Sequence, residues 1–137
     1  MVFTSAGRVF RLKAHELPDA GRDARGQHLA NILQLGPEES VAEVMPLRDY
    51  NEAPYLLLAT RKGMIKKTRL AEYDSPRSAG LIAINLREGD TVVGAMLLGD
   101  NQDAMLVSKR GYSVRFHAGD KSVRPMGRTA TGVRGIA

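Results

Sequence analysis

The chain has 137 residues, a net charge of +5, 43% hydrophobic residues, 5% aromatic residues and no cysteine. This length and hydrophobic content are sufficient for a folded domain or for an array of small repeats, and they argue against a disordered chain. The lack of cysteine excludes disulfides, thiolate metal sites and a cysteine nucleophile, and the scarcity of aromatic residues argues against nucleic-acid recognition by base stacking.

Three segments predict β-hairpins of one design, namely residues 2–12, 57–68 and 105–116. Each has an apolar strand, a tight turn that ends in glycine and a second strand. The turn glycines are Gly7, Gly63 and Gly111, and a hydroxyl residue (Thr or Ser) stands three positions before each. Glycine supplies the positive φ that such turns need. The recurrence predicts an internal repeat.

In the second strand of each hairpin, alternate positions predict two different faces. Positions 1, 3 and 5 after the glycine are mostly apolar, so we expect them to face the core. Positions 2, 4 and 6 carry many basic residues, so we expect them to face water or a ligand. Position 4 is cationic in all three copies, as Arg11, Lys67 and Arg115.

A second block follows each hairpin, in which a polar connection leads to a glycine and an apolar strand. These strands are predicted within residues 25–32, 79–86 and 131–136. Basic residues precede the glycine each time, and they are Arg22, Arg25, Arg77, Arg124 and Arg128. A further strand follows an acidic turn in the first two repeats, at residues 40–45 and 91–96.

Each full repeat therefore has four short strands, and the best helical candidate is one turn at residues 70–73. The expected repeats are residues 1–50, 51–98 and 99–137, and the third lacks its last strand. Unpaired sheet edges would result, which natural proteins avoid. We therefore expect the chain to be a piece of a longer array.

The positive charge is concentrated in the later repeats. Residues 1–50 carry 6 Lys/Arg and 7 Asp/Glu, residues 51–98 carry 7 and 5, and residues 99–137 carry 7 and 3. Such a gradient indicates a polyanionic partner, although a solvated surface would show it as well.

Three motifs resemble the C-terminal domain of the A subunit of bacterial DNA gyrase. They are Ala-Thr-Arg-Lys-Gly-Met-Ile-Lys-Lys-Thr at residues 59–68, Glu-Gly-Asp at 88–90, and the block from Arg-Pro-Met-Gly-Arg to Gly-Val-Arg-Gly-Ile at 124–136. The resemblance covers essentially the whole chain. It implies an all-β, propeller-like β-pinwheel, here a partial disc of four-stranded antiparallel blades in which neighbouring blades exchange a strand.

The resemblance also implies the function. Duplex DNA would wrap around a basic outer rim, without sequence specificity, and so support ATP-dependent negative supercoiling by the catalytic core of the gyrase. The basic glycine-rich box usual in the family, of the Gln-Arg-Arg-Gly-Gly-Lys-Gly type, does not occur here. Either the chain begins after the blade that carries the box, as we expect, or its parent protein lacks the box.

We expect phosphate contacts from the basic residues of the hairpins and from the arginines before the glycines. The candidates are Arg8, Arg11, Lys13, Arg25, Lys62, Lys66, Lys67, Arg69, Arg77, Lys109, Arg110, Arg115 and Arg128. The implied partners are double-stranded DNA, the remainder of the gyrase A subunit and the gyrase B subunit, with no membrane and no small-molecule substrate.

The sequence indicates no catalytic residue, no metal site and no cofactor in this chain; ATP and magnesium would act in other domains. The three histidines are not at metal-ligand spacing, and no Walker loop or nucleophile elbow is present. No apolar run approaches the roughly 18–20 residues of a membrane span, and no signal-peptide pattern is present, so a cytoplasmic protein is expected. The resemblance implies that it is associated with the nucleoid. Two alternatives stay open, the related domain of the topoisomerase IV A subunit and a propeller-like protein-interaction platform.

Overall fold

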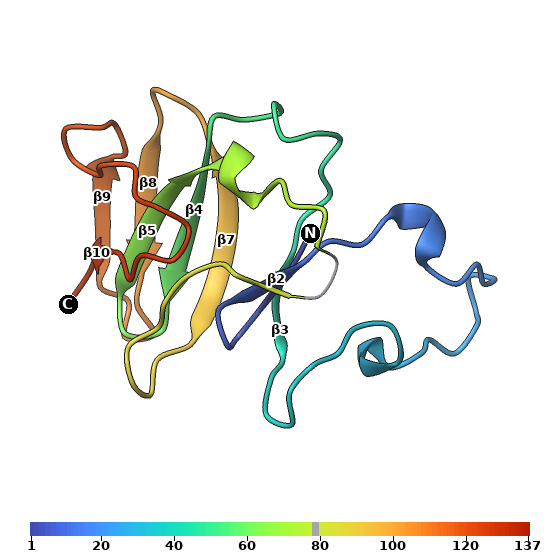
Figure 1. The fold of residues 1–137 in the computed structure, drawn as a ribbon. Coiled ribbons are helices and arrows are strands. Elements are labelled where there is room, and N and C mark those ends of the chain that lie inside the picture. Colours follow the sequence, from blue (N-terminus) through green and yellow to red (C-terminus); the bar gives the residue numbers. More distant parts are fainter. Residues whose placement is uncertain (78–79) are drawn as a thin grey trace.

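The computed structural model describes residues 1–77 and 80–137, and it is an all-β structure as predicted (Figure 1). The strands are β1 (Val2–Thr4), β2 (Arg8–Phe10), β3 (Val41–Val44), β4 (Tyr55–Thr60), β5 (Met64–Arg69), β6 (Leu81–Ile82), β7 (Val92–Leu98), β8 (Asp103–Val107), β9 (Ser113–His117) and β10 (Val133–Arg134). Three short 3-10 helices, η1 (Ala14–Glu16), η2 (Leu29–Asn31) and η3 (Leu70–Tyr73), lie between strands. The single turn predicted at residues 70–73 is η3.

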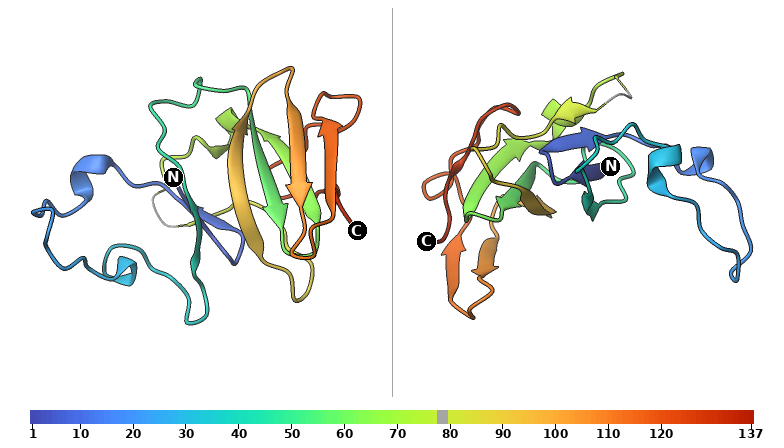
Figure 2. Two further views of the ribbon diagram at one scale, coloured as in Figure 1. Left: turned by 180° about the vertical axis from the view of Figure 1, so that it is seen from behind. Right: turned by 90° about the horizontal axis from the view of Figure 1, so that it is seen from below.

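The strands form three antiparallel sheets that lie side by side, as Figure 2 shows. Sheet 1 has the order β3-β1-β2-β6, sheet 2 has the order β10-β5-β4-β7, and sheet 3 consists of β8 and β9. The first two hairpins predicted from a turn glycine form the centres of sheets 1 and 2, and the third hairpin is sheet 3 itself.

Neighbouring repeats exchange a strand, as the family resemblance implies. β6 follows the second hairpin in the chain but pairs with β2 of the first, with Arg8 opposite Ile82. In the same way β10 follows the third hairpin and pairs with β5, with Val133 opposite Ile65. Sheets 1 and 2 are therefore each completed by a strand from the following repeat.

The exchange is anchored at the carbonyl of each turn glycine. The Gly7 oxygen accepts from the amide of Ala83 at 2.7 Å, and the Gly63 oxygen accepts from the amide of Gly135 at 2.8 Å. A Cβ atom on Gly63, whose φ is +80°, would lie 2.2 Å from the Ile136 oxygen. Glycine is needed here both for the positive φ and for the close approach of the exchanged segment.

The apolar strand predicted within residues 25–32 does not form. Residues 29–31 are η2 instead, and the segment with η1 and η2 projects away from the sheets (Figure 1). Residues beyond η2 turn back, and Leu33 packs with Val2 and Phe10 on the outer face of sheet 1. The other two exchanged strands form within the predicted blocks, although Ala79, the start of the second block, lies outside the described residues.

Two hydrophobic cores separate the three sheets. The core between sheets 1 and 2 contains Phe3, Leu56 and Leu58, and the core between sheets 2 and 3 contains Tyr55, Leu57 and Ala104. Since successive residues of a strand face opposite sides, β4 supplies side chains to both cores. Sheet 2 is thus covered on both faces, and side chains from both sides of its middle strands are buried.

The hydroxyl residue before each glycine turn closes the turn. Thr60 Oγ1 accepts from the amide of Met64 at 3.1 Å and donates to Asp90 Oδ2 at 2.7 Å. Thr4 makes the equivalent bonds to the amide of Arg8 and to Glu39. The acidic turns recognised in the sequence therefore hold the hairpin turns of their own repeats.

Candidate nucleic-acid interface

The exchanged strands lie at the outer edges of the first two sheets. β6 and β10 form one edge of sheets 1 and 2, whereas β3 and β7 form the other edge and contact each other. The rim is defined here as β6 and β10 together with the segments that precede them, residues 70–77 and 118–132. It is the part of the described surface that a ligand outside the array of sheets would meet first.

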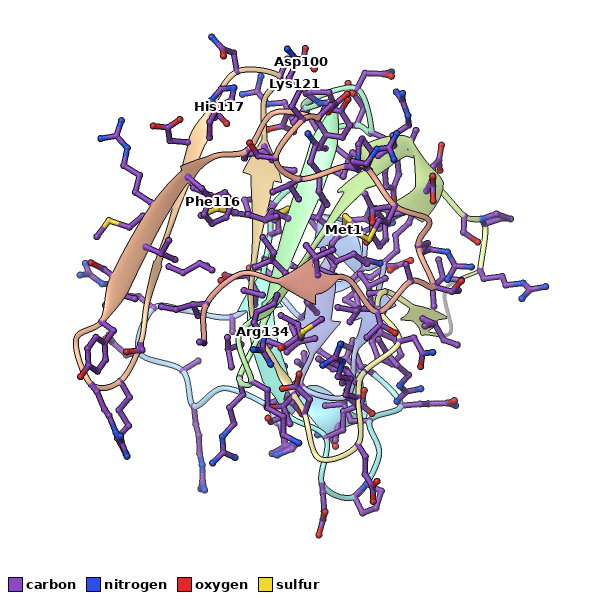
Figure 3. All side chains as sticks on the ribbon, turned by 90° about the vertical axis from the view of Figure 1, so that its left-hand side faces the viewer. Met1, Asp100, Phe116, His117, Lys121 and Arg134 are labelled. Carbon is purple, nitrogen blue, oxygen red and sulfur yellow. The ribbon has the colours of Figure 1, made fainter. Side chains whose placement is uncertain are left out.

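Basic side chains gather along the rim and beside it. Arg77, Lys121, Arg124 and Arg134 are exposed, and Arg128 is half-buried. Lys121 and Arg134 lie on the face of the molecule seen in Figure 3. These residues present positive charge without a deep cavity, which is the arrangement that suits a polyanionic backbone.

A groove next to β10 is lined by two of these charges and by Arg69. Its lining is Arg69, Asp120, Lys121, Ser122, Arg124, Pro125, Met126 and Val133. Arg69 comes from the end of β5, and the other residues come from the third repeat. The groove brings Arg69 of the second repeat together with Lys121 and Arg124 of the third, a proximity that depends on the strand exchange.

A second basic group lies at the hairpin turns. Arg61, Lys62, Lys109 and Arg110 are exposed, and the turns of the second and third hairpins line one groove. The Lys62 ammonium donates to the Glu88 carbonyl at 2.6 Å. Two predicted candidates, Lys62 and Lys109, are therefore brought together by the structure.

Three predicted arginines have acidic partners. The Arg8 guanidinium binds Glu39, Arg115 binds Asp103 at 2.6 Å, and Arg11 lies 3.6 Å from Asp74. The hydrogen bond from Arg115 lowers the pKa of Asp103, and a hydrogen bond from His117 lowers it further. The hydrogen bond between Arg8 and Glu39 is partly buried, which restricts the Arg8 side chain. Arg11 and Arg115 are exposed and can reach a ligand.

Lys66 and Lys67 are wrong as phosphate contacts, because both side chains are buried with 0% exposure. The Lys66 ammonium donates to the carbonyls of Ala83 and Arg128. The Lys67 ammonium donates to the Ala118 carbonyl at 2.9 Å and to Asp120 at 2.7 Å. The expectation that position 4 of each hairpin faces water or a ligand therefore fails at Lys67, whose side chain points between sheets 2 and 3.

The predicted division into a core face and a solvent face also fails for β5. Residues 64–68 are all buried, whichever way they point. The alternation rule assumes a sheet with one wet face, but sheet 2 has a neighbouring sheet on each side. β9 follows the predicted alternation, with Val114 and Phe116 partly buried between exposed residues, but Tyr112, just before the strand, is 71% exposed although a core position was predicted.

Lys13 and Arg25 are exposed on the projecting segment, away from the sheets, together with Arg22. The candidates predicted from the sequence left out Arg61, Lys121, Arg124 and Arg134, although all four are exposed on the turn or rim surfaces. Alignment of the repeats could have identified Arg134, because it has the same position in β10 as Ile82 has in β6. Each lies opposite the residue that follows a turn glycine.

Within residues 1–77 and 80–137, no group of three or more His, Asp or Glu side chains is placed to hold a metal ion. No helix in that part of the chain has the length and apolarity to cross a membrane. The chemistry that the described surface offers is therefore charge, supplied by arginine and lysine at the rim and at the hairpin turns.

Comparison with protein families and curated proteins gives consistent matches. A family model described as DNA gyrase C-terminal domain, beta-propeller, matches residues 1–48, 54–98 and 102–137. The chain is 54% identical to the DNA gyrase A subunit of Mycolicibacterium smegmatis over 136 residues, which cover 99% of this chain and 16% of the relative. It is also 54% identical to the DNA gyrase A subunit of Streptomyces coelicolor, over 100% of this chain and 17% of the relative. The chain thus spans about a sixth of the length of these relatives.

Among solved structures, the C-terminal domain of DNA topoisomerase IV superposes with a TM-score of 0.86 at 36% identity, covering 97% of this chain and 41% of that one. The DNA gyrase A C-terminal domain gives a TM-score of 0.76 at 25% identity, covering 98% of this chain and 42% of that one. The backbone resembles both, so the sequence decides between them. The match to the gyrase family model and the 54% identity with gyrase A subunits over essentially the whole chain favour the gyrase family over the topoisomerase IV alternative.

Proposed function

The chain belongs to the DNA gyrase C-terminal domain family of beta-propeller type, and on this premise we propose that it binds duplex DNA along its basic rim and bends it. In this role it is a non-catalytic, DNA-wrapping part of an ATP-dependent type II topoisomerase. Its partners are double-stranded DNA, the remainder of the gyrase A subunit and the gyrase B subunit. It needs no cofactor of its own.

The observation that carries the proposal is the row of cations that the exchanged strand β10 and its preceding segment place on the rim. Arginine and lysine there neutralise phosphates and release counterions, which gives salt-dependent binding without sequence specificity. Bending a site of 20–30 bp by 40–90° costs on the order of 1–6 kcal/mol. Several rim cations must therefore act together, and the hairpin-turn cations are placed to extend the contact.

The test is charge reversal of three exposed rim residues, Lys121→Glu, Arg124→Glu and Arg134→Glu. Duplex binding is measured against salt concentration, and each lost phosphate contact reduces the slope of log K against log salt by about 0.9. The three changes together should therefore reduce it by about 2.7. The buried Lys66 and Lys67 are unsuitable for this test, because a buried glutamate would disrupt folding.

A matched control reverses three exposed charges on the projecting segment, Lys13→Glu, Arg22→Glu and Arg25→Glu. It changes the net charge by the same amount but leaves the rim intact, so the slope should fall less than in the rim variant. Equal losses would show that net charge, and not the rim, drives binding. A chain that binds no duplex DNA at low or moderate salt would refute the proposal and favour a protein-interaction platform.

A further inference from the structure

The buried Lys66 lies where two exchanged segments of the chain meet. Its ammonium contacts the carbonyls of Ala83 and Arg128 and lies 3.5 Å from the carbonyl of Gly127. Ala83 follows β6, which completes sheet 1, whereas Gly127 and Arg128 precede β10, which completes sheet 2. One side chain therefore joins the outer segments of two successive sheets.

Other bonds at this junction are few. The Asn85 amide donates to the Ala130 carbonyl at 3.2 Å, and the Arg128 guanidinium donates to the Ile82 carbonyl at 2.6 Å. The Arg128 amide donates to Glu72 Oε2 at 2.9 Å. Between β9 and β10 the chain forms no other strand in residues 118–132. Ala118 and Val123 anchor the beginning of residues 118–132 in the core between sheets 2 and 3, so these polar contacts mainly hold residues 127–130.

Lys66 is the buried member of that set. An ammonium has three donors and can satisfy carbonyls from separate segments at once, which no backbone amide can do. Without the ammonium, the Arg128 carbonyl loses the donor that the Lys66 side chain supplies, so its segment would shift to reach water instead. The ring of Tyr73, 5.8 Å from the ammonium, and the Tyr73 hydroxyl, which donates to the Ala83 carbonyl at 3.2 Å, hold the first segment in place.

We infer that Lys66 is a positioning residue for DNA binding: by holding residues 127–128 against Ala83, it sets Arg124 and Arg128 on the rim without touching phosphate itself. This inference rests on the proposed function, since it assigns a role to a residue behind the DNA-binding surface. It also gives Lys66 a function opposite to the direct contact predicted from its place in the hairpin.

Lys67 provides a matched control. It has the same charge, lies on the same strand and is equally buried, but its ammonium binds Ala118 and Asp120 at the beginning of the segment. Residues 126–128 keep their other contacts without it, including the bond from the Met126 amide to the Lys67 carbonyl at 2.8 Å. Lys67→Met should therefore leave Arg124 and Arg128 in place.

The experiment compares Lys66→Met and Lys67→Met in the full chain by hydrogen exchange and by duplex binding against salt. Lys66→Met should speed exchange at residues 126–130 and reduce the salt slope by about 1.8, the value for two phosphate contacts. Lys67→Met should change exchange only near residues 118–121 and reduce the slope by no more than about 0.9, the value for Lys121 alone. In an Arg124→Ala/Arg128→Ala background, Lys66→Met should reduce the slope no further.

A second variant covers the case in which Lys66→Met fails to fold. Glu72 is exposed, and Glu72→Ala removes the acceptor of the Arg128 amide while raising the net charge. Bulk charge alone would then strengthen DNA binding, whereas a loosened segment weakens it. Equal behaviour of the two lysine variants, or tighter binding by Glu72→Ala, overturns the inference. If the unmodified chain binds no DNA, the proposed function fails, and hydrogen exchange still shows whether Lys66 positions the segment.

Discussion

Glu39 supports the first hairpin through a concentrated set of hydrogen bonds, and its removal makes a quantitative prediction. Its carboxylate accepts from Arg8 Nε at 2.9 Å, from the Gly36 amide at 2.8 Å and from the Thr4 hydroxyl, and its side chain is 5% exposed. The hydrogen bond from Arg8 is the largest cause that lowers the pKa of Glu39, from 4.5 to about 2, and the bonds from Thr4 and Gly36 act in the same direction against the effect of burial.

The shift of pKa converts directly into stability. A carboxylate with a folded pKa of about 2 and an ordinary value of 4.5 stabilises the folded state by about 3 kcal/mol at neutral pH. Because the folded pKa is the lower one, this contribution is complete above pH 4.5 and is lost as the pH falls towards 2. Glu39→Gln should therefore cost about 3 kcal/mol at pH 7 and progressively less below pH 4.5.

The assay is urea unfolding of the natural chain and of Glu39→Gln at several pH values between 2 and 7. Glu38→Gln is the control, since it removes the same charge from the exposed neighbouring position, and it should change stability by less than about 0.5 kcal/mol. A Glu39→Gln effect that is the same at pH 3 and pH 7 would refute the reasoning, because it would show that the ionised carboxylate is not the stabilising species.

Two further predictions concern the exchanged segments. Gly63→Ala should destabilise the chain by more than about 2 kcal/mol, because the new Cβ would meet the Ile136 carbonyl. Gly111 has φ +84° and open space around it, so Gly111→Ala should cost only the left-handed backbone strain of about 1–2 kcal/mol. Equal losses of stability in urea unfolding would contradict this prediction. Burial lowers the pKa of Lys66 to about 8, with nearby Arg128 lowering it further and Glu72 opposing. Above pH 8 the unfolded chain therefore binds more protons than the folded chain. The stability of the natural chain relative to that of Lys66→Met should rise by about 2 kcal/mol between pH 8 and 10. A difference between their denaturation midpoints that does not change with pH would exclude this pKa shift.

The sequence was sufficient for the features that depend on local chemistry. Gly7, Gly63 and Gly111 each adopt the positive φ that the hairpin pattern predicts. The acidic turns also follow from the sequence, although their bonds to Thr4 and Thr60 become visible only in the structure. Turn glycines and strand alternation are short-range signals, so they can be recognised without knowing the neighbours of a segment.

The tertiary structure alone decided which sheet each outer strand joins and which cations reach the surface. β6 and β10 have two residues each, too few to select a partner by their own pattern, and they are placed by the carbonyls of turn glycines in the preceding repeat. Lys66 and Lys67 have the sequence environment of surface lysines, yet the chain next to β6 and before β10 encloses their ammonium groups. Burial depends on what packs against a strand from distant parts of the chain, and that information is not present in the strand itself.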